Sequence, residues 1–155
     1  MAPKRFLVVR DNAPDGALRG AVVAMGNFDG VHRGHRAVIA AALHRARGLA
    51  RPPAVLTFEP HPRAYFHPNE PLFRLTDEAA KLRLLAATGL DGTIVLTFDA
   101  ALASLTAADF VARILVERFG ASGAVIGFNF HFGNNRAGSP EFLVAQGREH
   151  GFAVD

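Results

Sequence analysis

A ten-residue stretch at positions 26–35 constrains the fold of this chain more than any other feature. Its sequence is Gly-Asn-Phe-Asp-Gly-Val-His-Arg-Gly-His. The apolar run 21–25 before it is typical of a buried strand. After it, apolar residues recur at helical spacing: Val38, Ile39, Ala42, Leu43, Ala46 and Leu49. A strand, a glycine-containing turn and a helix start with free N–H groups together predict a phosphate-binding site.

Two histidines, His32 and His35, flank Gly34 at the predicted helix start. A side chain at position 34 would block the close approach of a phosphate. The stretch has neither the Gly-Lys-Ser/Thr ending of a P-loop nor the glycine spacing of a dinucleotide-binding turn. The alternatives are a metal-binding pair or two solvated histidines. With no cysteine and no third ligand at a recognisable spacing, we expect no protein metal site.

The composition limits the class of protein. The chain has 155 residues, is 50% hydrophobic and contains no repeats, which predicts one domain with a sizeable core. We expect a cytoplasmic protein that does not enter a membrane, because no apolar segment is long enough for a signal peptide or a membrane span. The net charge is +3, and the basic residues are scattered. This pattern favours small phosphorylated partners, and we expect no nucleic acid.

The secondary structure is predicted to alternate between strands and helices. The expected strands are 6–9, 21–25, 54–58, 93–97 and 124–126, all short and apolar. The expected helices are 34–50, a second from Thr76 to near Gly89, a third from Thr106 and a fourth from Ser139, where capping residues open each of the last three. This order predicts an α/β fold, a doubly wound (Rossmann-like) parallel sheet.

Unusual polar and aromatic loops follow four of these strands, at 26–35, 59–63, 98–99 and 127–138. Ligands of such sheets bind beyond the carboxyl ends of the strands, so we expect these loops to converge on one edge. The Phe-Glu-Pro-His-Pro segment at 58–62 is rigid, although a stiff surface turn is the alternative. In 127–138, phenylalanines alternate with Asn129 and His131, which suits a flat heteroaromatic ligand or an ordinary strand extension.

Three of these segments, in this order, resemble motifs of one family. The His-x-Gly-His ending of 26–35 is the signature of the nucleotidyltransferase superfamily. The extended form of that motif, the segment 58–62 and the segment 127–138 resemble bacterial FAD synthetases, which are bifunctional riboflavin kinase/FMN adenylyltransferases. Thr76, Lys81 and the pair Phe98-Asp99 also match the spacing of that family.

The resemblance implies a reaction and a set of site residues. ATP and FMN would give FAD and pyrophosphate, with Mg²⁺ accompanying ATP. The catalytic residues implied are His32 and His35. The residues implied around ATP are Gly26, Phe28, Asp29, His32, Gly34 and His35. The residues implied around the flavin are Phe58, Pro60, His61, Pro62, Phe66, Asn129 and Phe132. Asp29 would lie close to the triphosphate, and it either orients the loop or holds the metal indirectly.

The family pattern extends further than Asp155. Residues 152–155 look like the beginning of one more strand of this pattern, a Ser-Ser-Thr-x-Ile-Arg motif should follow that strand, and then a riboflavin kinase domain. We therefore expect residues 1–155 to be an incomplete FMN adenylyltransferase domain that forms little FAD by itself. Two other hypotheses remain: a nucleotidyltransferase with another phosphorylated acceptor, and a flavin- or nucleotide-binding module without catalysis.

Overall fold

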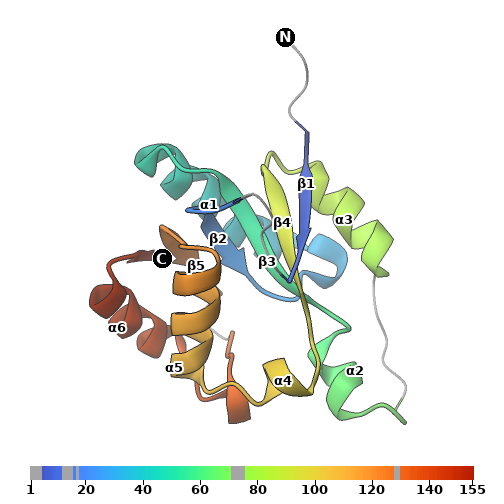
Figure 1. Ribbon diagram of the computed structural model, residues 1–155. Helices are drawn as coiled ribbons and strands as arrows, with labels where there is room; N and C mark the ends of the chain where they lie inside the picture. Colours follow the sequence, from blue (N-terminus) through green and yellow to red (C-terminus); the bar gives the residue numbers. More distant parts are fainter. Residues whose placement is uncertain (1–4, 12–15, 17, 71–75, 128–129) are drawn as a thin grey trace.

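The computed structural model describes residues 5–11, 16, 18–70, 76–127 and 130–155. Within them the chain forms a six-stranded sheet in which all strands are parallel, in the order β1-β4-β3-β2-β5-β6 (Figure 1). The strands are β1 (Leu7–Arg10), β2 (Val22–Met25), β3 (Pro53–Glu59), β4 (Gly92–Thr97), β5 (Gly123–Val125) and β6 (Ala153–Val154). The predicted parallel α/β fold is confirmed, and the five predicted strands lie within one residue of the observed ones.

The longer helices begin directly after the residues that cap them. They are α1 (Arg33–Leu49), α3 (Glu78–Ala86), α5 (Ala107–Asp109), which continues into the π-helix η3 (Phe110–Arg118), and α6 (Pro140–His150). Thr106 accepts a hydrogen bond from the Asp109 N–H, and Ser139 accepts one from the Phe142 N–H. Both predicted caps are confirmed. Because their side chains satisfy amide groups that the first turn leaves unpaired, the two helix starts are well defined.

The structure corrects the start of α3 and adds short helices. Asp77, and not Thr76, caps α3: its carboxylate accepts a hydrogen bond from the Ala80 N–H at 2.8 Å. The short helices that the sequence did not predict include η2 (Asp29–Val31), α2 (Pro62–Phe66), α4 (Ala100–Ala103) and η4 (Asn134–Arg136). The first three follow the carboxyl ends of β2, β3 and β4.

Helices cover both faces of the sheet and divide the core in two. On one face, α1 and α3 pack on alternate residues of β2, β3 and β5, with Ile39, Ala42 and Leu85 at the centre. On the other face, η3 and α6 cover the remaining alternate residues, with Phe110, Ile114 and Leu143 buried there. This double burial explains why the strands are apolar without alternation. The polar loops therefore gather at the carboxyl edge, on the side of α2 and α4 in Figure 1.

Candidate functional site

The segment 26–35 forms a tight turn between β2 and α1. Gly26 is buried and its N–H bonds to the Leu56 carbonyl of the neighbouring strand. Phe28 is only 1% exposed, and its backbone has a left-handed φ of 54°. The Phe28 ring lies against the His35 ring, with centroids 5.1 Å apart. Its side chain therefore supports His35 from the core and offers a ligand almost no exposed surface.

His32 and His35 form a reciprocal cap at the start of α1. The His32 N–H donates to His35 Nδ1 at 3.2 Å, and the His35 N–H donates to His32 Nδ1 at 3.4 Å. The two rings stack, with centroids 3.5 Å apart and planes inclined by 19°. Because both Nδ1 atoms accept hydrogen bonds, each neutral ring carries its proton on Nε2. The pair thus has two Nε2–H donors available at a helix N-terminus, which is itself favourable for anions.

The charge state of His35 follows from its surroundings. Burial lowers the pKa of His35 from its ordinary value of 6.5 to about 4, and the neighbouring His32 and the more distant Lys81 act in the same direction. Asp29 opposes this shift in the pKa of His35 without cancelling it. His35 is therefore a neutral hydrogen-bond donor at neutral pH, and it is not a proton carrier there.

Gly34 lies close to the His32 ring, where a side chain would have little room. A Cβ atom at this position would lie 3.2 Å from His32 Cε1 and 3.4 Å from His32 Nδ1. The first of these contacts is tighter than ordinary van der Waals contact, so a side chain at position 34 would require the His32 ring to shift by a few tenths of an ångström. The glycine expected to admit a phosphate also preserves the arrangement of the two donors.

Asp29 holds the loop in place through Thr76. Its Oδ1 accepts hydrogen bonds from the Thr76 N–H at 2.8 Å and the Thr76 hydroxyl at 3.1 Å. The Thr76 hydroxyl oxygen in turn accepts from the Gly30 N–H at 3.1 Å. Of the two roles the sequence left open for Asp29, this geometry supports orientation of the loop. Thr76 was expected to cap a helix, but its side chain is engaged in this contact instead.

The Phe-Glu-Pro-His-Pro segment ends β3 and starts α2. The Glu59–Pro60 peptide bond is cis, and Pro62 is the first residue of α2. His61 caps this short helix, because its Nδ1 accepts a hydrogen bond from the Arg63 N–H at 3.1 Å. This stiff turn places α2 and its exposed Phe66 beyond the carboxyl edge of the sheet.

A continuous series of ring contacts connects the two segments predicted to bind the flavin. The contacts, with centroid separations, are Phe66–Phe98 at 5.7 Å, Phe98–Phe58 at 6.0 Å, Phe58–Phe110 at 6.4 Å and Phe110–Phe132 at 5.3 Å. Phe66 is 58% exposed, whereas Phe58 and Phe132 are buried. Only the Phe66 end of the series offers a large free ring surface. Asn129 lies outside the described residues.

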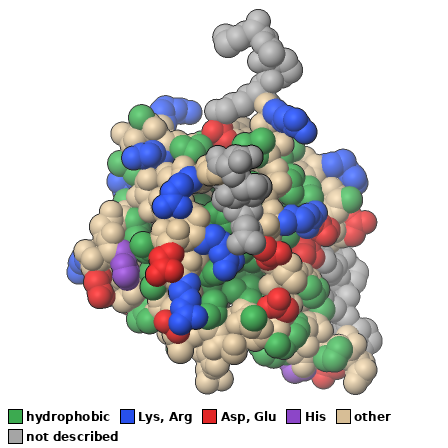
Figure 2. All heavy atoms as spheres, viewed as in Figure 1, with side chains coloured by type: hydrophobic (Ala, Val, Ile, Leu, Met, Phe, Trp, Pro, Cys, Tyr) green, Lys and Arg blue, Asp and Glu red, His purple; other side chains and the backbone are tan. Residues whose placement is uncertain are grey.

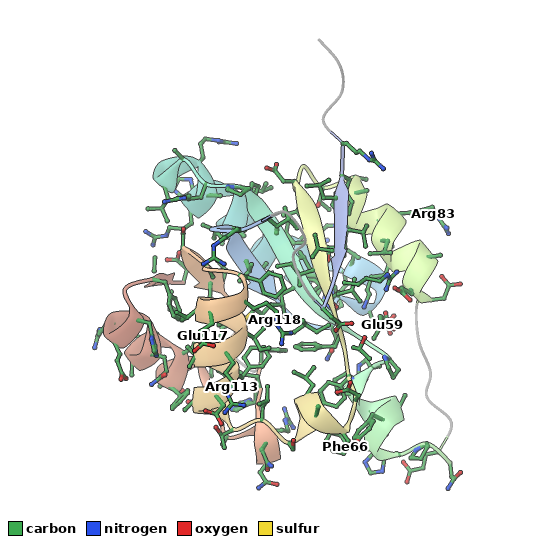
Figure 3. The ribbon with its side chains drawn as sticks, viewed as in Figure 1. Glu59, Phe66, Arg83, Arg113, Glu117 and Arg118 are labelled. Carbon is green, nitrogen blue, oxygen red and sulfur yellow. The ribbon has the colours of Figure 1, made fainter. Side chains whose placement is uncertain are left out.

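A cavity of about 330 Å³ lies between β4, α4 and η3. Its lining includes the apolar Leu96, Leu102, Leu105 and Ile114 together with Arg113 and Arg118. In Figure 2 hydrophobic side chains are visible at the centre of this face with Lys and Arg side chains around them, and Figure 3 labels both arginines. The sequence alone did not reveal these residues, because no local motif marks side chains brought together from β4, α4 and η3.

The sequence also gave no role to Lys81. This residue of α3 is 1% exposed, and its ammonium lies 2.8 Å from Glu59 Oε1. It also donates to the Asn27 carbonyl and to Thr57 Oγ1, both at 3.1 Å. The ammonium therefore contacts both the histidine turn and the end of β3. A lysine at a core-facing position of a predicted helix was the available signal, because lysine is rarely buried without a partner.

A parallel α/β sheet whose central strand leads into a His-x-Gly-His helix start defines a nucleotide-binding domain of the nucleotidyltransferase class. The sequence profile of the FAD synthetase family matches residues 15–155. The chain belongs to the FAD synthetase family, and the resemblance found in its sequence is confirmed.

Relatives of known name support this assignment. The bifunctional riboflavin kinase/FMN adenylyltransferase of Pseudomonas fluorescens is 43% identical over 137 residues, which are 88% of this chain and 44% of the relative. The enzyme of that name from Escherichia coli K12 is 37% identical over 143 residues, or 92% of this chain and 46% of the relative. The chain thus spans about half the length of the curated relatives it matches.

A solved structure has the same fold. It is described as a macrolide-efflux protein from Streptococcus pneumoniae, and it superposes with a TM-score of 0.78 at 26% identity, covering 97% of this chain and 50% of that one. This likeness supports the fold alone. Among the residues that the structure describes, no helix is both long and apolar enough to cross a bilayer.

The low pKa of His35 predicts a pH-dependent stability. The folded protein keeps His35 neutral down to about pH 4, whereas the unfolded chain takes up this proton near pH 6.5. The contribution of His35 to the free energy of unfolding is therefore complete above pH 6.5 and declines as the pH falls from 6.5 to 4. Urea unfolding of the wild type and of His35→Gln between pH 4 and pH 7.5 measures it. The wild type should lose more stability than the variant across this window, and parallel curves would contradict the assignment.

Proposed function

We propose that this domain transfers the adenylyl group of ATP to FMN, giving FAD and pyrophosphate. The observation that supports it most directly is the stacked pair His32 and His35, which presents two Nε2–H donors at the start of α1. The aromatic series ending at Phe66 lies at the same carboxyl edge of the sheet. One edge thus combines donors for a triphosphate with surface for a flat ring system.

The proposed reaction is a direct displacement at phosphorus. A phosphate oxygen of FMN attacks the α-phosphorus of ATP, a new P–O–P linkage forms, and the bond to the leaving pyrophosphate breaks. His32 and His35 donate hydrogen bonds from Nε2–H to triphosphate oxygens, where negative charge increases as pyrophosphate departs. Gly26 and Gly34 allow the turn to approach the phosphates, Phe28 supports His35, and Asp29 fixes the turn through Thr76. The protein's contribution is thus position and charge stabilisation.

Mg²⁺ fits this site as an ion that arrives with ATP. Within the described part of the chain, no three His, Asp or Glu side chains are grouped as metal ligands. Magnesium commonly binds substrate phosphates with few protein ligands, and it would supply neutralisation of their charge. The residues of the turn mainly provide N–H donors, which complement phosphate oxygens rather than the ion.

On the flavin side we propose different roles for the seven residues. Phe66 offers its exposed ring for stacking, and Pro60, His61 and Pro62 hold α2 in position. Phe58 and Phe132 support this arrangement from the core, and Asn129 supplies an amide for hydrogen bonding to the flavin. The neighbouring cavity has the size of a small-molecule pocket. We further propose a cytoplasmic protein in which riboflavin kinase activity resides in a separate domain.

The direct test is product formation. The protein expressed from its full reading frame is incubated with ATP, MgCl₂ and FMN, and FAD and pyrophosphate are quantified by chromatography and a coupled assay. Equimolar FAD and pyrophosphate are expected. If product forms with nicotinate mononucleotide or phosphopantetheine but not with FMN, the acceptor is that compound and not FMN. If the protein binds ATP or FMN but forms no product, it is a non-catalytic binding module.

Replacing His35 with Ala should lower kcat for FAD formation by ~10²–10³, the usual effect of removing one transition-state donor. The affinity for FMN should change little, because the flavin segments lie on other loops. His44→Ala is the matched control, since His44 is an exposed histidine on the same helix. Steady-state kinetics measure both, and equal kcat values for the two variants would remove His35 from the mechanism.

Replacing Phe66 with Ala should weaken FMN binding about 2- to 10-fold, as expected for the loss of one aromatic contact. ATP affinity should be unchanged. Phe66 suits this test better than Phe132, because Phe132 is buried and its truncation would leave a cavity. Quenching of FMN fluorescence measures the dissociation constant, with Leu49→Ala as an exposed apolar control. Unchanged FMN affinity in Phe66→Ala would exclude its ring from the flavin site.

A further inference from the structure

The buried ammonium of Lys81 joins two segments that bind different substrates in the proposed function. Besides the ion pair with Glu59, its Nζ lies 3.1 Å from the Asn27 carbonyl, 3.1 Å from Thr57 Oγ1 and 3.5 Å from the Phe58 carbonyl. Asn27 belongs to the turn that carries the histidines. Glu59 directly precedes Pro60, where the flavin-side segment begins. One cation therefore bridges the two segments.

The helix that carries Lys81 contacts the histidine turn a second time. Thr76, just before α3, binds Asp29 and the Gly30 N–H. Lys81, one turn into the helix, binds the Asn27 carbonyl on the other side of Phe28. The turn is therefore held on both sides of Phe28, at Asn27 by Lys81 of α3 and at Asp29 and Gly30 by Thr76, and of these two side chains Lys81 also contacts β3.

Stability alone gives a weak reason for this lysine. Burying an ammonium is costly, and an ion pair in the interior commonly stabilises no more than apolar side chains of similar volume. The Thr57 hydroxyl donates to the Asn27 carbonyl at 3.1 Å independently of the lysine, so part of the link would persist without it. What an apolar residue could not provide is a directional contact with Glu59 and Asn27 at the same time.

We propose that Lys81 is a positioning residue that couples the histidine turn to the flavin-side segment, so that FMN phosphate and ATP meet in line. This inference rests on the proposed adenylyl transfer. Lys81 does not need to touch either substrate. Because misplacement by about 1 Å can reduce a rate ~10²-fold, its effect should appear in kcat more than in the affinity for either substrate.

The experiment compares Lys81→Met with Arg83→Met. Both replace a cationic residue on α3, but Arg83 is exposed and points away from the sheet in Figure 3, where Glu59 is also labelled. In the protein expressed from its full reading frame, Lys81→Met should lower kcat ~10–10²-fold, with FMN and ATP dissociation constants within about 3-fold of wild type. Arg83→Met should match the wild type. Lys81→Arg, which retains the charge, should recover part of the loss.

A double-mutant comparison tests whether the ion pair acts as one unit. Glu59→Gln should lower kcat by itself, and the Lys81→Met/Glu59→Gln variant should lose no more than Lys81→Met alone. Circular dichroism and thermal melting show which variants are folded. If Lys81→Met fails to fold, Glu59→Gln carries the test, because it retains the bonds of Lys81 to Asn27 and Thr57 while removing the carboxylate.

The possible outcomes distinguish failure of the proposed function from failure of this inference. Absence of FAD formation by the unaltered protein would overturn the proposed function and this inference with it. FAD formation by folded Lys81→Met at the rate of Arg83→Met would overturn the inference alone, as would equal loss of affinity for both substrates with kcat retained. That last result would assign Lys81 a structural role.

Discussion

Parallel pairing of every strand is the constraint on which the rest of this structure depends. A parallel strand must be followed by a crossover to the opposite edge, so all loops that leave carboxyl ends share one side of the sheet. In this order of strands, β2 lies between β3 and β5, and the chain passes from one half of the sheet to the other around it. The histidine turn leaves β2 at that switch point, where sheets of this kind bind ligands. The location of the site is therefore a consequence of topology.

Sequence patterns predicted the fold where one local signal dominated. The strands could be located within one residue because burial on both faces makes each an unbroken apolar run. Thr106 and Ser139 are caps whose hydrogen bonds close within three residues. The start of α3 was misplaced because Thr76 and Asp77 are both good caps, and the choice depends on Asp29, which lies 47 residues away. The short helices α2 and α4 were missed, since they are too brief to show a period.

In the candidate site, too, the sequence predicted the contiguous motif but not the residues that reach it from other elements. The histidine turn is a contiguous motif, so its six residues could be named from the sequence alone. The support for it is not contiguous: Thr76, Thr57 and Lys81 reach it from other elements. Aromatic residues of the proposed flavin side were identified by type, but the sequence could not distinguish the exposed Phe66 from the buried Phe58 and Phe132. Exposure is decided by packing among distant residues, and it determines which ring can meet a ligand.

The electrostatics of His35 and of the Lys81–Glu59 ion pair indicate different roles for these residues. His35 is kept neutral at physiological pH mainly by its burial, so it donates hydrogen bonds without adding a full charge. Such donors gain strength as charge grows on the phosphate oxygens, and they do not bind ground-state ATP with the strength of a cation. The Lys81 ammonium, by contrast, forms an ion pair with Glu59 at 2.8 Å. A cation so compensated is poorly suited to attract phosphate and well suited to hold two segments at a fixed distance.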